Sequence, residues 1–233
     1  MLVAIHQPNF FPWLGYFDKI RRADAFVFLD AVAYPRKGSG GMGSWVNRVQ
    51  LSVQGEAKWV TAPVKSITLG TPIKDVVTDS NQHWRSKLQK TLHSNYGRAP
   101  RFAEAMALLV PLIDAPETNL AAFNMAAIRA ISSHLGLPGR FLLQSQLPHQ
   151  GAATNLLISL VKAAGGEAYL AGGGASGYQE DKLFAEQGIR LVYQGFKPQP
   201  YGDPARFLPG LSIIDYLMHD GRPLDEAFGA ADA

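Results

Sequence analysis

The sequence predicts an α/β fold with a parallel, Rossmann-like sheet. Residues 2–5 form a short apolar run, residues 13–22 carry apolar side chains at helical spacing, and residues 25–29 form a second apolar run. A strand, a helix and a second strand in such a short stretch indicate a βαβ unit with a right-handed crossover. Strand and helix patterns alternate again after residue 141, as a parallel sheet requires.

The middle of the chain is predicted to be mainly helical. Helical patterns cover residues 84–96 and 103–137, and Asn119 precedes an alanine-rich run as a helix N-cap would. We interpret these helices as packing against the sheet. We therefore expect residues 1–233 to form a single α/β domain with a helical cap or insertion at about 80–140.

The remaining segments are short. Residues 31–48 include KGSGGMG, lack periodicity and are predicted to form a long loop, whereas residues 58–64 resume strand character. The later predicted strands and helices cover residues 141–144, 155–164, 168–171, 183–187 and 190–193.

Composition excludes several classes of protein. The chain has no cysteine, so it has no disulfide, thiolate metal site or thiol nucleophile. No apolar run is long enough to cross a membrane, and the N-terminus lacks the basic region of a signal peptide, so we expect a cytoplasmic protein without membrane insertion. Basic residues are scattered without interleaved stacking aromatics, which argues against nucleic-acid binding. Their densest group, Lys19, Arg21 and Arg22, indicates either a pocket for phosphate or carboxylate or a solvated face.

The first candidate site follows the first strand, in the segment HQPNFFPW. His6 and Gln7 come directly after buried residues, where α/β proteins place ligand-binding groups. A histidine there can act as base, acid or anion-binding donor, because its ordinary pKa is about 6.5. We predict that His6 and Gln7 are catalytic. The alternative is that His6 caps the next helix or satisfies a buried carbonyl.

The aromatic residues of this segment are predicted to shape a pocket. The turn contains rigid prolines flanked by Phe11, Trp13 and Tyr16. We therefore expect it to form the wall of a pocket rather than an ordinary loop. We interpret these three side chains as substrate-binding.

Polar residues elsewhere in the chain complete the predicted site. Asp30 ends the second strand and is predicted to be catalytic by orienting His6 or holding a hydroxyl, although capping the next turn is as good an interpretation. Asn47 and Arg48 offer an amide and a bidentate guanidinium to a carboxylate or phosphate. Ser145 closes a further strand on the same edge and is predicted to bind substrate.

A glycine-rich segment follows the strand AYLA. Backbone amides of Gly172, Gly173 and Gly174 are free to approach anionic oxygens, and Ser176 and Tyr178 supply hydroxyls. The pattern is neither GxGxxG nor a P-loop, so it identifies no cofactor, and a plain loop is the alternative.

One further pair is noted without being assigned. Asp215 and His219 lie one turn apart on a predicted short helix, where they form a pair able to bind a metal. Two ligands alone do not define a metal site, and we predict none.

Several ordered motifs carry a family resemblance. HQPNFFPWLGYFDKI, DAFVFLD, SWVNR, WVTAPV, AYLAGGGASGY and LSIIDYLMHDG resemble the WbqC-like family of bacterial proteins, from Ile5 to Gly221. One departure is KGSGGMG, which lengthens the link between Pro35 and Ser44. The resemblance implies a setting among surface-polysaccharide and natural-product genes, and with it modification of an amino sugar or similar amine.

Three functions are compatible with these features. The first is a small-molecule transferase that moves an acyl or aminoacyl group to an amino sugar or other amine, with His6 as base and an anionic or sugar-linked substrate. The second is nucleotidyl or adenylyl transfer, since the opening resembles the HIGH-type nucleotidyltransferases but lacks a second histidine at HxGH spacing. The third is a non-catalytic ligand-binding or scaffold protein that works with partner enzymes of a pathway. The cofactor is not identified by the sequence.

Overall fold

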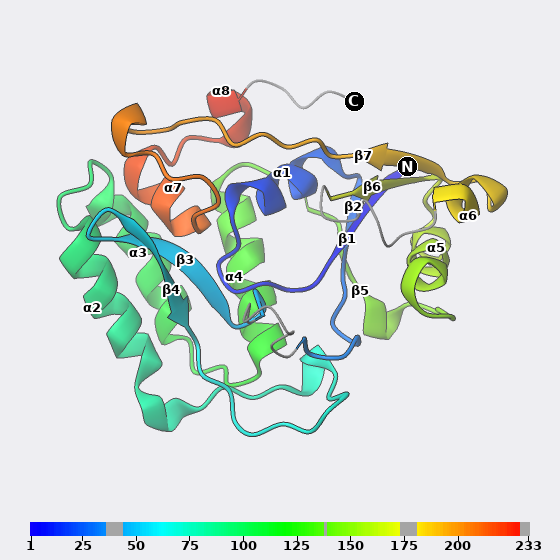
Figure 1. The fold of residues 1–233 in the computed structure, drawn as a ribbon, viewed down its shortest axis with the longest axis horizontal. Coiled ribbons are helices and arrows are strands. Elements are labelled where there is room, and N and C mark those ends of the chain that lie inside the picture. Colours follow the sequence, from blue (N-terminus) through cyan, green and yellow to red (C-terminus); the bar gives the residue numbers. More distant parts are fainter. Residues whose placement is uncertain (36–43, 138, 173–180, 229–233) are drawn as a thin grey trace.

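The computed structural model describes residues 1–35, 44–137, 139–172 and 181–228. Seven strands are present in these residues: β1 (Leu2–His6), β2 (Ala25–Phe28), β3 (Arg48–Val53), β4 (Glu56–Thr61), β5 (Phe141–Leu143), β6 (Ala168–Ala171) and β7 (Arg190–Tyr193). Five of them form one parallel sheet in the order β5-β2-β1-β6-β7 (Figure 1). The predicted α/β fold with a parallel, Rossmann-like sheet is therefore confirmed.

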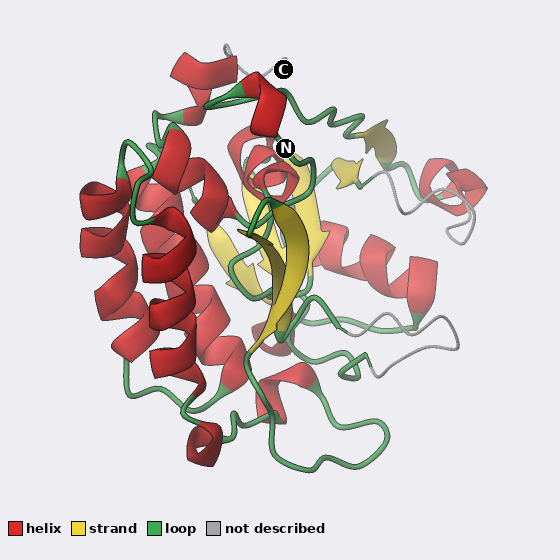
Figure 2. Ribbon diagram, turned by 60° about the vertical axis from the view of Figure 1, so that its left-hand side comes forward, coloured by secondary structure: helices red, strands yellow, loops and turns green. Residues whose placement is uncertain are grey.

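Helices cover both faces of this sheet. They are α1 (Leu14–Arg22), α2 (Trp84–Tyr96), α3 (Phe102–Asp114), α4 (Leu120–His134), α5 (Ala153–Ala163), α6 (Asp181–Glu186), α7 (Ile213–His219) and α8 (Leu224–Phe228). Figure 2 shows α5 and α6 on one side of the sheet and the larger helical group on the other. Within the described residues, none of these helices is long and apolar enough to cross a bilayer.

The side chains of β1 alternate between two cores, as expected for a strand covered on both faces. Val3 and Ile5 pack with the core under α5 and α6, which includes Ile158 and Phe184. Ala4 faces the larger core on the opposite side. Both faces of the central strand are buried, which fixes the position of its last residue.

The strand order changes direction at β1: β2 and β5 lie on one side of it, and β6 and β7 lie on the other. Val3 lies opposite Ala25 of β2, whereas Leu2 lies opposite Ala168 of β6 on the other side. In such sheets ligands bind outside the carboxyl ends of the two strands at the reversal. His6 ends β1 at this point, and Gly172 follows β6.

The helical pattern predicted over residues 103–137 is two helices rather than one. A short link at residues 115–119 separates α3 from α4, and the Asn119 side chain accepts a hydrogen bond from the Ala122 N–H at 2.9 Å. The predicted N-cap is therefore confirmed. Gly136, with φ of 71°, ends the second helix. The organisation as one domain with a helical insertion stays a prediction.

The sequence interpretation missed the hairpin of β3 and β4. Residues 31–48 were predicted as a loop, yet β3 begins at Arg48, and β4 spans 56–61 rather than 58–64. Gln54 and Gly55 both have positive φ, of 55° and 80°, the geometry of a type I′ hairpin turn. Its signal is weak because glutamine is not a typical residue for the first position of that turn. Residues 36–43 of the predicted loop lie outside the described residues.

Candidate functional site

The turn after β1 is held in place by hydrogen bonds from distant elements. Asn124 on α4 is fully buried, and its amide donates to the Pro8 carbonyl at 2.8 Å. The Ser212 hydroxyl donates to the Phe11 carbonyl at 2.7 Å. Phe11 itself has φ of 38°, an uncommon conformation for a non-glycine residue that surrounding contacts must maintain. The turn is therefore a rigid support for the residues that precede it.

A cavity of about 620 Å³ lies at the carboxyl ends of β1 and β6. This volume is typical of a pocket for a small molecule. Its polar lining comes from His6, Gln7, Lys19 and Thr154, with Gly172 at the end of β6. Its walls are otherwise mainly aliphatic, with one aromatic side chain from β6: Ile5, Leu29, Val32, Ala33, Ala153, Leu156, Leu157 and Tyr169.

His6 is held as a neutral imidazole with one nitrogen available. Its Nδ1 lies 3.2 Å from the Gln7 carbonyl oxygen, which can only accept, so Nδ1 carries the proton and donates. Tyr16 and Trp13 contact the ring edge-on, at centroid distances of 4.8 and 5.7 Å. Burial lowers the pKa of His6 to about 3, and the nearby Lys19 charge adds to this effect. Nε2 therefore presents a lone pair at neutral pH.

Lys19 is a buried ammonium group beside His6. The residue is only 3% exposed, and within the described residues Nζ donates one hydrogen bond, to the Ile5 carbonyl at 3.2 Å. Burial lowers the pKa of Lys19 to about 8, so the group is still mainly charged at pH 7. At the pH at which Lys19 loses its proton, His6 is already neutral. The histidine therefore has no charge that would shift the pKa of Lys19. Lys19 forms no ion pair with the described residues, and its charge is suited to an anionic ligand.

The N-terminus of α5 adds to the positive character of the cavity. Ala153 and Thr154 from its first turn line the cavity. The N-cap residue Ala152 has no side chain that could cap the helix, and the first turn holds no acidic residue. Helix N-termini favour anions. Gly172 also lies near the cation, since a Cβ at Gly172 would be 3.9 Å from Lys19 Nζ.

The aromatic residues support His6 rather than line the cavity. Phe11 is fully buried and packs against Phe123 in the helical core. Tyr16 is also fully buried, and its hydroxyl donates to the Gln7 carbonyl at 2.9 Å. Trp13 is partly buried and packs on Trp45, with a centroid distance of 5.2 Å. These side chains do not form an open aromatic patch of the kind that a scaffold protein would present.

Asp30 is occupied by a neighbouring strand end. One carboxylate oxygen accepts the Ser145 N–H at 2.9 Å, and the other accepts the Ser145 hydroxyl. Asp30 therefore joins the ends of β2 and β5 rather than orienting His6. Neither Asp30 nor Ser145 lines the cavity.

Asn47 and Arg48 also lie apart from the cavity. The Asn47 amide donates to the Ala62 carbonyl at 3.0 Å, and the Arg48 guanidinium stacks 4.1 Å from the centre of the Trp59 ring. The cation that the cavity holds is Lys19, not Arg48. Gly173, Gly174, Ser176 and Tyr178 lie outside the described residues.

Sequence reasoning noted Lys19 only as one of several basic residues. A usable signal was its position on α1, three residues after Tyr16 and adjacent to Ile20, both of which are buried. A lysine on the apolar face of a short helix is unusual, because burial of an ammonium is unfavourable unless something compensates for it.

The chain matches known proteins over nearly its whole length. The model of the WbqC-like protein family matches residues 7–224. Over 230 residues, 94% of each chain, the sequence is 30% identical to a Mycobacterium tuberculosis (strain ATCC 25618 / H37Rv) protein described as uncharacterized protein Rv1507c. No solved structure gives a significant match. The chain belongs to the WbqC-like protein family.

Proposed function

We propose that this protein is a small-molecule transferase that moves an acyl or aminoacyl group to an amine such as an amino sugar. The observation that carries the proposal is a buried ammonium, Lys19, beside a neutral histidine, His6, in a cavity at the reversal point of the sheet. An anionic group of the substrate supplies the negative counter-charge for the Lys19 ammonium. The gene setting implied by the family resemblance supports an amine as the acceptor.

Each group has a distinct role in the proposed reaction. Lys19 and the first turn of α5 hold the anion, and the aliphatic walls hold the uncharged part of the substrate. The amine nitrogen attacks the acyl carbon of an activated donor, so a carbon–nitrogen bond forms and the bond to the leaving group breaks with its electron pair. His6 Nε2 accepts the proton from the nitrogen.

Substrate binding brings His6 closer to the pKa that a base requires. Burial is the first cause of the low pKa of His6, and the Lys19 charge is the second. A bound anion offsets that charge and raises the histidine pKa toward neutrality. Binding of the anionic substrate therefore makes His6 a stronger base.

Nucleotidyl transfer is the second candidate. Its specific support is the position of His6 at the end of β1, directly before α1, in a sheet of order β5-β2-β1-β6-β7. A histidine there can stabilise phosphate oxygens in the transition state, and Lys19 can assist. Stabilisation by ATP or CTP with magnesium that depends on His6 would favour this candidate over acyl transfer.

Thermal-shift measurements on the full chain test the anion site. We expect inorganic phosphate, pyrophosphate or simple carboxylates to raise the melting temperature, because a ligand that binds only the folded state stabilises it. Lys19→Met removes the cation and should abolish the shift. Lys65→Met is the matched control, since Lys65 is exposed and does not line the cavity. Equal shifts in both variants, or none in the original chain, would contradict the proposal.

A further inference from the structure

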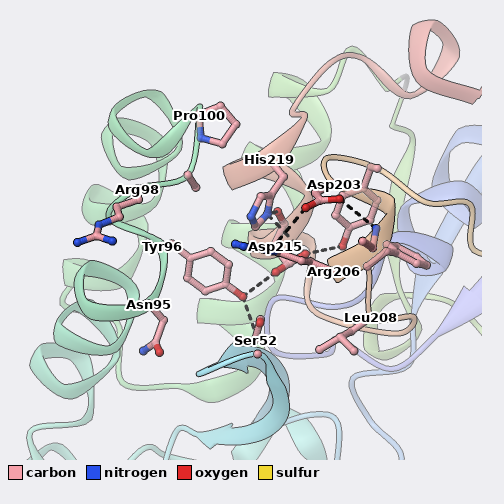
Figure 3. A pocket seen from close by; sticks show the side chains of 15 residues that line it. Ser52, Asn95, Tyr96, Arg98, Pro100, Asp203, Arg206, Leu208, Asp215 and His219 are labelled. Carbon is pink, nitrogen blue, oxygen red and sulfur yellow. Dashed lines mark hydrogen bonds and ion pairs between the residues drawn. The ribbon is translucent and has the colours of Figure 1, made fainter.

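A second cavity, of about 580 Å³, has no lining residue in common with the first. Figure 3 shows it between the end of α2, the segment 201–208 and α7. Ser52 and Gly55 of the β3–β4 hairpin complete its lining. Aromatic and charged side chains meet there, although the proposed transfer reaction uses none of them.

The floor of this second cavity is a buried carboxylate. Asp215 is 5% exposed, and its two oxygens accept hydrogen bonds from the Tyr96 and Tyr201 hydroxyls, both at 2.8 Å. The Tyr96 oxygen in turn accepts the Ser52 N–H at 2.9 Å. Burial raises the pKa of both tyrosines, and the Asp215 charge raises it further, so the phenols remain donors. Two neutral donors orient the carboxylate but leave its negative charge in place.

His219 lies beside this carboxylate with one ring nitrogen unused. Its Nδ1 donates to the Asp215 backbone carbonyl at 2.9 Å and is 3.7 Å from the Asp215 side chain. In the tautomer that carries its proton on Nδ1, Nε2 is an acceptor, and Nε2 has no hydrogen-bond partner in the part of the chain that the structure describes. Gly202, with φ of 64°, packs so closely that a Cβ would lie 3.0 Å from His219 Cβ.

The rim of the second cavity carries a cation, Arg206, together with Asp203. Arg206 is 88% exposed in its side chain and lies 3.6 Å from an oxygen of Asp203, also exposed. An exposed pair of this length contributes little, so Arg206 is available to a ligand. In Figure 3 the Arg98 guanidinium points away from the cavity. A carboxylate thus lies at the floor, and a guanidinium lies at the rim beside the exposed Asp203 carboxylate.

We propose that the second cavity binds a small zwitterion, a molecule with a primary ammonium and a carboxylate or phosphate group. The ammonium donates to the Asp215 carboxylate and to His219 Nε2, and the anionic group accepts from Arg206. A simple anion would meet the uncompensated Asp215 charge, and a simple amine would leave Arg206 unused. This inference goes beyond the proposed function and does not depend on transfer at His6.

Calorimetric titration of the full chain tests this second site. We expect glycine and phosphoethanolamine, which carry both charges, to bind at least about tenfold more tightly than ethylamine or acetate, which carry one. Comparison of glycine with phosphoethanolamine distinguishes a carboxylate from a phosphate ligand. Equal binding of ethylamine, or no binding of either zwitterion, would overturn the proposal.

Two kinds of variant make the test specific. Arg206→Gln alters an exposed side chain and should weaken zwitterion binding about ten- to a hundredfold, because a charge-assisted hydrogen bond is lost. Arg190→Gln is the matched control, since Arg190 is exposed and lines neither cavity. Asp215→Asn tests the role of the carboxylate at the floor of the second cavity. If that variant fails to fold, Tyr201→Phe, which removes one hydrogen bond to Asp215, is used in its place. Unchanged binding in Arg206→Gln would refute the assignment.

Discussion

At the scale of single residues, the ionisation of Lys19 couples the cavity to folding stability. Its pKa in the folded chain, about 8, lies below the ordinary value of 10.5, so between these values the unfolded chain binds more protons. Stability should therefore rise with pH in this range. We expect the native chain to gain about 1–2 kcal/mol relative to Lys19→Met between pH 8 and 9.5. Urea unfolding of both chains at the two pH values measures the difference, and parallel curves would contradict it.

His6 should give the corresponding effect in acid. Its folded pKa of about 3 lies below the ordinary 6.5, so the unfolded chain gains a proton first as the pH falls. Stability is then lost below pH 6.5. After allowance for the partial exposure of His6, the expected loss is about 1–2 kcal/mol between pH 7 and 5. His6→Asn should lack this part of the acid destabilisation in urea titrations, whereas the background from carboxylates remains in both chains.

At the scale of elements, α4 holds the turn after β1 in position. Asn124 donates to the carbonyls of both Pro8 and Val46, at 2.8 and 2.7 Å, and so joins two segments that are distant in sequence. Asn124→Leu leaves both carbonyls buried without a donor, and we expect a loss of about 3 kcal/mol. Ser132→Ala is the control, because this buried hydroxyl on the same helix has no partner within the described residues and its removal should be nearly neutral. Chemical denaturation compares the two.

Elements could be predicted from the sequence more fully than the site could. Periodicity and caps identified α2 and β7 with their observed bounds, because those signals are local. The cavity depends on contacts between distant residues. Asp30 is predicted from its position at a strand end and Arg48 from the chemistry of its guanidinium, yet their partners, Ser145 and Trp59, belong to other elements. Local sequence patterns cannot show that a polar side chain already interacts with a residue of another element.

At the scale of the whole molecule, α7 lies between the turn beside the first cavity and the floor of the second. Ser212 caps this helix and contacts the turn beside His6, whereas Asp215 and His219 line the second cavity. Because the cavities share no lining residue, we expect the stabilisation by phosphate and by glycine to add within about 0.5 kcal/mol. Melting curves with each ligand and with both test this. A larger departure would reveal coupling through α7.

The central position of β1 has a consequence for how the molecule forms during synthesis. Leu2 emerges well before one of its neighbours in the sheet, Ala168, which lies far along the chain. Until then β1 has an open edge and an uncovered apolar face, which are features that promote aggregation. The binding cavity is thus among the last parts to close, and slow assembly of the native state is the expected kinetic signature of contacts so distant in sequence.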